Sequence, residues 1–277
     1  MKILKYIGLV LGITLAVSCD EHEIEYNTTT VSDLAEFQLH YFVPVTANSS
    51  NNIYRVEIND SVYANSTAPL YTYNAIPSGA VGRFFTVNPG EVNIKLYLGT
   101  DEELVYDQHV ALTAGKQNIF VHDFNQEPVV FDNGYPYVSN ITLDTDSTCY
   151  VKFYNFLYET EGVPCDLKLQ YQYVDPRTDE MVNLGEPVSF GETTGWQPVK
   201  VVKSIYNSSG YARVYYKIKV VDENGNLGGD LQHWNSNGNY KSYSDYWNGY
   251  IGRRYHHVLS GMRSAFPIAA VRQFTAL

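Results

Sequence analysis

Residues 92–98 read Val92-Asn93-Ile94-Lys95-Leu96-Tyr97-Leu98, a stretch in which apolar and polar side chains alternate. Successive side chains of a β-strand point to opposite faces of its sheet, so this alternation predicts a strand with one buried face and one hydrated face. The same pattern recurs at 36–41 and 54–58, and further strands fit 104–112 and 117–124. Helical periodicity is almost absent. The sequence therefore predicts an all-β protein.

A second β-rich block follows a break at 131–136, where turn-forming residues cluster without alternation. Strands fit 150–158, 167–174, 182–190, 197–205, 211–221, 254–259 and 268–274. We predict two tandem immunoglobulin-like or transthyretin-like β-sandwiches, the first at 34–133 and the second at 134–277. The strand count up to Val130 suits a seven-stranded first sandwich.

Composition sets limits on the partners. The 277 residues are 44% hydrophobic and 18% charged, which is enough apolar material for one large or two medium domains. Acidic residues number 30 and basic residues 19, a net charge of −11. A chain without a basic surplus is poorly suited to hold a phosphate backbone, so we expect no nucleic-acid partner.

The N-terminus has the layout of a secretory signal. Lys2 and Lys5 precede an apolar run at 7–17, which is too short to span a bilayer. The stretch Leu15-Ala16-Val17-Ser18-Cys19 resembles the lipobox of bacterial lipoproteins. That resemblance implies removal of residues 1–18 and acylation of Cys19 with fatty acids such as palmitate, whose chains anchor the protein. The alternative is an ordinary secretory signal followed by an incidental cysteine.

Acidic residues follow Cys19 directly, in Asp20-Glu21-His22-Glu23-Ile24-Glu25, and a polar stretch continues to Thr30. This composition predicts a flexible tether at 19–33. The acidic patch resembles the export signal of surface lipoproteins in polysaccharide-utilising Gram-negative bacteria, although Asp20 alone is similar to an inner-membrane retention signal. We expect a lipid-anchored outer-membrane protein exposed at the cell surface. Removal of Lys2 and Lys5 brings the charge to −13, so membrane contact should come from the lipid.

Two cysteines remain after lipidation, and two states are open to them. Cys149 and Cys165 can oxidise in an extracytoplasmic compartment. If their strands were hairpin partners, the two residues would lie at opposite ends, far beyond disulfide reach. A bridge therefore requires strands in different sheets, and two buried thiols are the alternative.

The two blocks look like weak copies of one another. Each opens with an aromatic-rich strand (37–42 and 150–156), and each closes with a strand after a small-residue turn (118–121 and 255–259). In this layout the chain resembles an uncharacterised family of tandem β-sandwich domains common in bacterial surface lipoproteins. The resemblance covers most of 34–265 and implies fold and location. The family has no established catalytic residues, so none are carried over.

Catalytic and metal motifs are not found in the sequence. It contains no GxSxG, HExxH, Walker-type or GxGxxG motif. His256 and His257 are adjacent in a predicted strand and point to opposite faces, so they cannot chelate one ion together. The run at 222–226 alternates oxygen ligands, but Leu227 and His233 stand where a calcium loop of EF-hand type needs Gly and Glu. A hairpin turn at Asn224-Gly225 explains it better, and we expect no metal or cofactor.

The richest local signal is aromatic. The stretch 230–252 reads as a long loop in which tryptophans and tyrosines stand among amides and glycines. Such a mixture offers flat faces for stacking and polar groups for hydroxyls, as a carbohydrate or protein contact needs. The alternative is that the two tryptophans form a satellite core. The candidate ligand-binding residues are Trp234, Tyr240, Tyr243, Tyr246, Trp247 and Tyr250.

These observations predict a non-enzymatic surface lipoprotein that binds an extracellular ligand, either a glycan or a partner outer-membrane protein. An alternative comes from fimbrillin-type pilus subunits, which are also two-sandwich lipoprotein precursors and assemble by strand exchange. An enzyme is the third interpretation, because paired carboxylates act through space and no spacing reveals them.

Overall fold

The computed structural model describes residues 33–78, 82–132 and 147–276. By its contacts the chain divides into two compact units, Met1–Val31 and Ser32–Leu277. The predicted signal, Cys19 and nearly all of the tether lie outside the described residues, as does the predicted boundary between Asn133 and Gly134.

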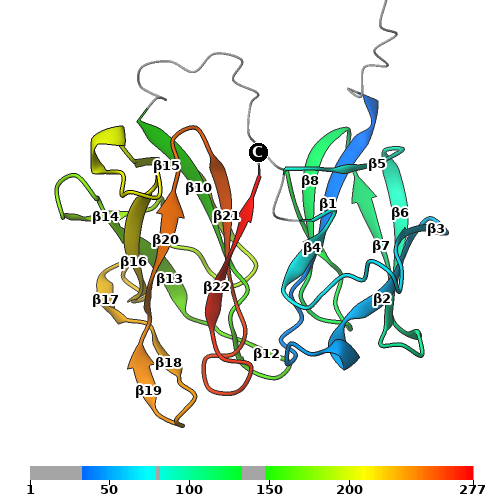
Figure 1. Ribbon diagram of the computed structural model, residues 1–277. Helices are drawn as coiled ribbons and strands as arrows, with labels where there is room; N and C mark the ends of the chain where they lie inside the picture. Colours follow the sequence, from blue (N-terminus) through cyan, green and yellow to red (C-terminus); the bar gives the residue numbers. More distant parts are fainter. Residues whose placement is uncertain (1–32, 79–81, 133–146, 277) are drawn as a thin grey trace, which may run out of the picture. The chain divides into compact units, whose positions relative to one another are not determined.

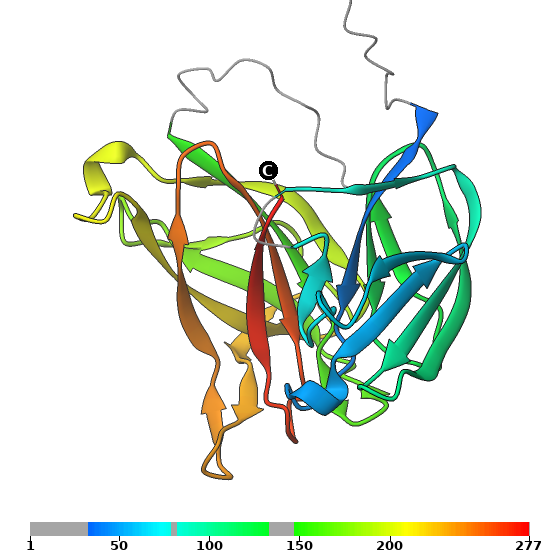
Figure 2. The ribbon, with the colours of Figure 1, turned by 45° about the vertical axis from the view of Figure 1, so that its right-hand side comes forward.

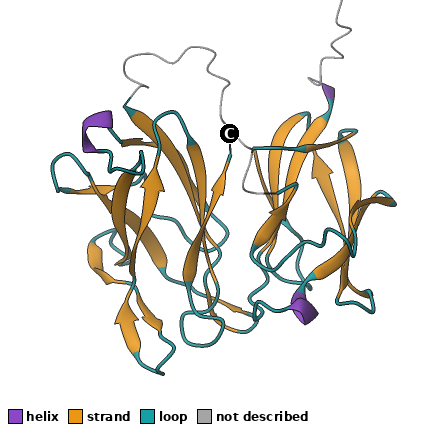
Figure 3. Cartoon of the chain, viewed as in Figure 1, coloured by secondary structure: helices purple, strands orange, loops and turns teal. Residues whose placement is uncertain are grey.

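The described residues form strands and turns, with short 3-10 helices at Ser49–Asn51 and Lys203–Ile205 and a 3-10 residue, Asp33, just before the first strand (Figure 3). The prediction of an all-β fold is confirmed. Within the described ranges, none of the helices is long and apolar enough to cross a bilayer.

The first sandwich comprises nine strands: β1 (Ala35–Tyr41), β2 (Ile53–Ile58), β3 (Ser61–Ala64), β4 (Asn74–Ile76), β5 (Phe85–Val87), β6 (Gly90–Leu98), β7 (Glu103–Leu112), β8 (Gly115–Val121) and β9 (Val129–Asp132). One sheet has the order β4-β1-β8-β9, with β5 also on β1, and the other has the order β3-β2-β6-β7. Val92, Ile94 and Leu96 of β6 are buried between them. The sequence predicted seven strands and not nine. The short strands β3, β4 and β5 have only three or four residues each, which is too few for an alternating pattern to be recognised.

The second sandwich has a similar two-sheet plan (Figure 1). Its strands are β10 (Thr148–Asn155), β13 (Lys168–Val174), β14 (Met181–Asn183), β15 (Thr193–Lys200), β16 (Ala212–Val221), β17 (Leu227–Asp230), β20 (Ser244–Gly249), β21 (Arg254–Ser260) and β22 (Ala270–Thr275). One sheet has the order β15-β10-β21-β22; the other has β14-β13-β16-β17, with β20 also on β16. Two small ribbons complete it, β11 (Tyr158–Thr160) with β12 (Val163–Pro164) and β18 (Gln232–Trp234) with β19 (Tyr240–Ser242).

Three predictions about this block were wrong in whole or in part. The stretch 230–252 is not one long loop, because it contains β18, β19 and β20. Its amides and glycines suggested a loop, yet Ser244–Gly249 pairs with β16, and within this strand Tyr246 is exposed while Trp247 is buried in the core. The predicted strand at 182–190 is a strand only over Met181–Asn183, and the segment predicted at 197–205 begins and ends earlier, as β15.

The internal similarity predicted from the sequence has a structural counterpart. The opening strand of each block pairs in parallel with the closing strand of that block, β1 with β8 and β10 with β21. In the turned view of Figure 2, β1 runs beside β8, and β22 follows β21 antiparallel. These four strands are buried almost throughout, because both faces of their sheets are covered.

A third apolar cluster joins residues of both sandwiches, and we call it the aromatic junction. It contains Phe42, Tyr73, Ala75, Phe120, Tyr154, Phe156, Val258 and Phe274. Phe120 of β8 packs against Tyr154 of β10 with ring centroids 4.9 Å apart. At its edge the Tyr158 hydroxyl lies 2.8 Å from Nδ1 of His122. The outer faces of the two parallel-paired sheets are thus buried against each other.

Candidate functional site

The outer face of β16 and β20 carries a pair of exposed tyrosines. Tyr215 and Tyr246 stand directly opposite each other in the antiparallel ladder of these strands. Their ring centroids are 5.9 Å apart, and the residues are 53% and 48% exposed. Large aromatic rings are usually buried, so two neighbouring rings left in solvent form an exposed apolar platform.

A pocket of about 420 Å³ opens beside this platform. Its lining includes Val174, Tyr215, Lys217, Ser244, Asp245 and Tyr246. The pocket therefore combines two flat aromatic faces with a hydroxyl, a carboxylate and an ammonium group. Concave sites with a few convergent polar groups are where small polar ligands bind.

Arg213 lies next to the platform on the same face of β16. Its guanidinium carbon is 4.5 Å from the centroid of the Tyr246 ring, a cation–π contact. Interactions with the Tyr215 and Tyr211 side chains raise the pKa of Arg213 above its ordinary value, so it carries a charge at every physiological pH. Three tyrosines thus hold one exposed guanidinium in place.

The aromatic contacts continue toward the start of β16. Tyr211 contacts Tyr250 at a centroid distance of 5.8 Å, and the Arg253 guanidinium carbon lies 4.3 Å from the centroid of the Tyr250 ring. Together these residues form what we call the tyrosine–arginine stripe. Its members are Tyr215, Tyr246, Arg213, Tyr211, Tyr250 and Arg253.

The six aromatic residues singled out from the sequence fall into three groups. Trp247 and Tyr243 belong to the core, with 5% and 4% of their surface exposed. Trp247 meets Tyr255 and His257 edge to face, and these rings fill the space between the sheets. Their side chains therefore stabilise the sandwich and present no face to a ligand.

Trp234 and Tyr240 form a second aromatic pair, on the β18–β19 ribbon. Their rings pack edge to face at 5.4 Å, and Tyr240 donates a 2.7 Å hydrogen bond to Oγ of Ser264. The ribbon is fastened at Trp234, whose amide donates to the carbonyl of Arg263. Tyr246 and Tyr250 make up the third group and belong to the tyrosine–arginine stripe.

Sequence reasoning missed Tyr215 and Tyr211. A signal was available, because 211–219 alternates strictly and its outward positions are Tyr211, Arg213, Tyr215, Lys217 and Lys219. A hydrated strand face that carries tyrosines among cations is unusual, since aromatic residues are normally on the buried face. The pairing of Tyr215 with Tyr246 could not be predicted from the sequence, because three other strands lie between β16 and β20 in the chain.

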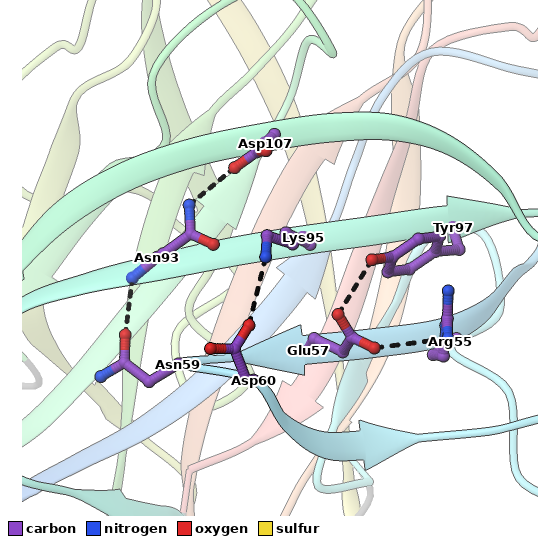
Figure 4. Close-up of polar contacts among 8 residues, drawn as sticks. All are labelled: Arg55, Glu57, Asn59, Asp60, Asn93, Lys95, Tyr97 and Asp107. Carbon is purple, nitrogen blue, oxygen red and sulfur yellow. Dashed lines mark hydrogen bonds and ion pairs between the residues drawn. The ribbon is translucent and has the colours of Figure 1, made fainter.

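The corresponding outer face of the first sandwich is different (Figure 4). Lys95 bonds Asp60 at 3.2 Å, and Tyr97 donates to Glu57 at 2.9 Å. Arg55 lies on the Tyr97 ring and also forms ion pairs with Glu57 and Glu102. These cations are thus neutralised by neighbouring carboxylates. In the described part of the chain, by contrast, Arg213 and Arg253 take part in no ion pair.

The cysteines and the candidate calcium turn add no further site. Cys149 lies in β10 and Cys165 in the loop between β12 and β13, and both are buried free thiols. The Asp222 carboxylate accepts hydrogen bonds from the amides of Asn224 and Asn226, which closes the β16–β17 hairpin. Over the described residues there is no group of three or more His, Cys, Asp or Glu placed to hold a metal ion.

Comparisons with known proteins gave limited likeness. No protein-family model matches the sequence, and no curated protein matches it. A solved structure of a candidate cell adhesion protein from Bacteroides uniformis is similar over 88% of this chain and 98% of its own, at 8% identity and a TM-score of 0.28. One from Bacteroides fragilis is similar over 88% and 97%, at 9% identity and a TM-score of 0.24.

The Bacillus anthracis TIE protein is similar over 83% of this chain but over 34% of its own length, at 7% identity and a TM-score of 0.24. The chain thus spans about a third of that protein. At these identities and TM-scores, the likeness does not assign the chain to a family.

Proposed function

We propose that this protein is a non-enzymatic, lipid-anchored surface protein that binds an extracellular glycan. The exposed platform of Tyr215 and Tyr246 beside its pocket is the observation that carries the proposal. Pyranose rings expose apolar C–H faces that stack on aromatic rings, while their hydroxyls need hydrogen-bond partners. Ser244, Asp245 and Lys217 supply such partners around the platform.

The platform is also preorganised. Tyr215 and Tyr246 project from paired strands, so their backbones are fixed by the ladder, and Arg213 rests on the Tyr246 ring. A tyrosine has two side-chain torsions, so little conformational entropy is lost when it is ordered by a ligand. Little of the binding free energy is therefore lost to ordering these side chains when the ligand binds.

Affinity electrophoresis tests the proposal. Residues 20–277, which contain the whole compact unit Ser32–Leu277, are run in native gels cast with a panel of soluble polysaccharides. We expect retardation by at least one glycan and a loss of about tenfold in affinity, or about 1.4 kcal/mol, in Tyr246→Ala. Tyr71→Ala removes an equally exposed tyrosine from the first sandwich and serves as the matched control.

Retardation that survives Tyr246→Ala but is lost in Tyr240→Ala would move the site to the β18–β19 ribbon. Equal mobility in every gel would refute glycan binding. Assembly by strand exchange would then be the competing function, and it makes its own prediction. The cell-surface form should then appear as a ladder of heat-labile multimers on denaturing gels, whereas a binding protein should run as a single band.

Lipid anchoring and surface exposure belong to the same proposal and rest on the sequence. The lipobox-like stretch before Cys19 and the acidic residues after it support them.

A further inference from the structure

Charge is distributed very unevenly along this acidic chain. Of its 30 carboxylate residues, none lies at 193–221 or 246–277, whereas nine of its 19 basic residues do. These basic residues are Lys200, Lys203, Arg213, Lys217, Lys219, Arg253, Arg254, Arg263 and Arg272. The two segments contain β16 and most of β20, together with the turn that carries Tyr250 and Arg253. The carboxylate-free parts of the chain therefore supply the tyrosine–arginine stripe.

Asp230 and Asp245 lie near the stripe, and neither forms an ion pair with Arg213 or Arg253. Asp230 lies 2.7 Å from Nζ of Lys219 and 3.5 Å from Nζ of Lys217, so two lysines share one negative charge. Asp245 lines the pocket at the far end of the stripe from Arg253. The region thus keeps a positive balance on a protein whose net charge is −11.

The arginines alternate with the rings that would contact sugar. Arg213 rests on Tyr246 and Arg253 rests on Tyr250, so each guanidinium lies on a tyrosine face of the stripe. A guanidinium group is planar and presents paired N–H donors, which match the oxygens of a carboxylate or a sulfate. A neutral sugar gives such donors no charged acceptor.

From this arrangement we propose that the tyrosine–arginine stripe binds an anionic polysaccharide. Arg213 and Arg253 hold carboxylate or sulfate groups of the polymer while Tyr246 and Tyr250 contact its sugar rings. This inference rests on the proposed function and narrows it to one class of glycan. The general negative charge of the protein disfavours such polymers elsewhere on its surface, so binding is confined to the stripe.

The test uses polymers that differ in charge alone. Residues 20–277 are run in native gels containing polygalacturonate or its highly methyl-esterified form, which shares the backbone but masks the carboxylates. Dextran sulfate and dextran form the second pair, so the two arms separate uronate from sulfate recognition. Each gel also carries Arg213→Gln, Tyr246→Ala and Lys241→Gln, the last of which removes one positive charge from the exposed β19 instead.

We expect the anionic member of at least one pair to bind about tenfold more tightly than its neutral counterpart. Arg213→Gln should lose that preference, Lys241→Gln should keep it, and added salt should weaken binding by the parent chain. Both variants should retain the parent's unfolding temperature, because both residues are exposed.

The failures are distinguishable. Equal binding to charged and uncharged polymers, unchanged in Arg213→Gln but lost in Tyr246→Ala, overturns the anionic specificity and leaves the proposed function standing. The inference is also overturned if Arg213→Gln and Lys241→Gln weaken binding to an anionic polymer equally. Binding would then depend on the overall charge of the protein and not on the stripe. No retardation by any polymer, charged or neutral, overturns both proposals.

Discussion

His40 of β1 and His256 of β21 face each other at the aromatic junction, with ring centroids 6.2 Å apart and ring planes at 73°. Both are fully buried. Nε2 of His40 lies 3.2 Å from Oδ1 of Asn118, and Nδ1 of His256 lies 2.8 Å from the Tyr154 hydroxyl. The junction of the two sandwiches therefore contains two imidazoles that fit there only in the neutral form.

This pair makes the fold sensitive to acid. Burial lowers the pKa of His40 to about 4, and burial together with the charge of His40 lowers the pKa of His256. As the pH falls below 6.5, these imidazoles bind protons in the unfolded chain but not in the folded protein. The free energy of unfolding is therefore highest above pH 6.5 and decreases toward pH 4. For His40 the loss is about 3 kcal/mol in total, or about 1.4 kcal/mol per pH unit.

Urea unfolding at pH 7.5, 6.5, 5.5 and 4.5 measures this dependence, with His40→Gln as the variant. Glutamine can still bond Asn118 but does not titrate, so the free energy of unfolding should fall less steeply with pH. A variant whose pH dependence matches that of the parent would show that His40 is not responsible.

Adjacent residues on β20 should respond in opposite ways to alanine. Trp247→Ala leaves a cavity in the core of the second sandwich and should lower the free energy of unfolding by about 3–5 kcal/mol. Tyr246→Ala removes an exposed ring and should change the free energy of unfolding by less than about 0.5 kcal/mol, while it lowers the affinity for the glycan about tenfold. Chemical denaturation of both variants makes the comparison. Similar losses of stability would mean that the inward and outward faces of β20 are assigned incorrectly.

Cys149 and Cys165 should react as buried thiols. Burial raises the pKa of both, so little reactive thiolate forms near neutral pH. Residues 20–277, which lack Cys19, should stay unmodified when treated in native form with iodoacetamide at pH 8, and mass spectrometry should find two labels after guanidinium denaturation without reductant. If labelling appears only once a reductant is added, a disulfide joins them.

Lipidation at Cys19 has a direct test. Cells fed an alkyne fatty acid should label the parent protein and leave Cys19→Ala unlabelled. Labelling of Cys149→Ala should equal that of the parent, since that thiol is buried. Equal labelling of Cys19→Ala and the parent would refute the lipoprotein assignment.

Much of the fold could be predicted because alternation is a local property. The strand read at 92–98 is β6, and that at 211–221 is β16, since each has one apolar and one polar face. β20 was not predicted as a strand because both of its faces carry aromatic residues, Trp247 inward and Tyr246 outward. With aromatic residues on both faces, a strand has no visible period, and its amides then resembled those of a loop.

The candidate site was predicted only in part, for a different reason. Tyr246 and Tyr250 were singled out by composition, but so was Trp247, which is buried. Sequence alone shows which residues are aromatic and not which face of a strand is covered. Tyr215 joins Tyr246 through strand pairing across about thirty residues of chain, and such non-local registers are not encoded in any short pattern.

The parallel pairing of opening and closing strands determines when each sandwich can fold. β1 cannot pair until β8 has been synthesised, because Ala35 pairs with Gly115, 80 residues later. In the same way β10 cannot pair with β21 until Arg254, the partner of Tyr150, has been synthesised 104 residues later. At a synthesis rate of about 5–20 residues per second, the first delay alone lasts about 4–16 s. During that interval the emerging chain can form neither the β1–β8 pair nor the β10–β21 pair. A polypeptide that has to cross a membrane unfolded thereby gains time for translocation before its own topology allows it to fold.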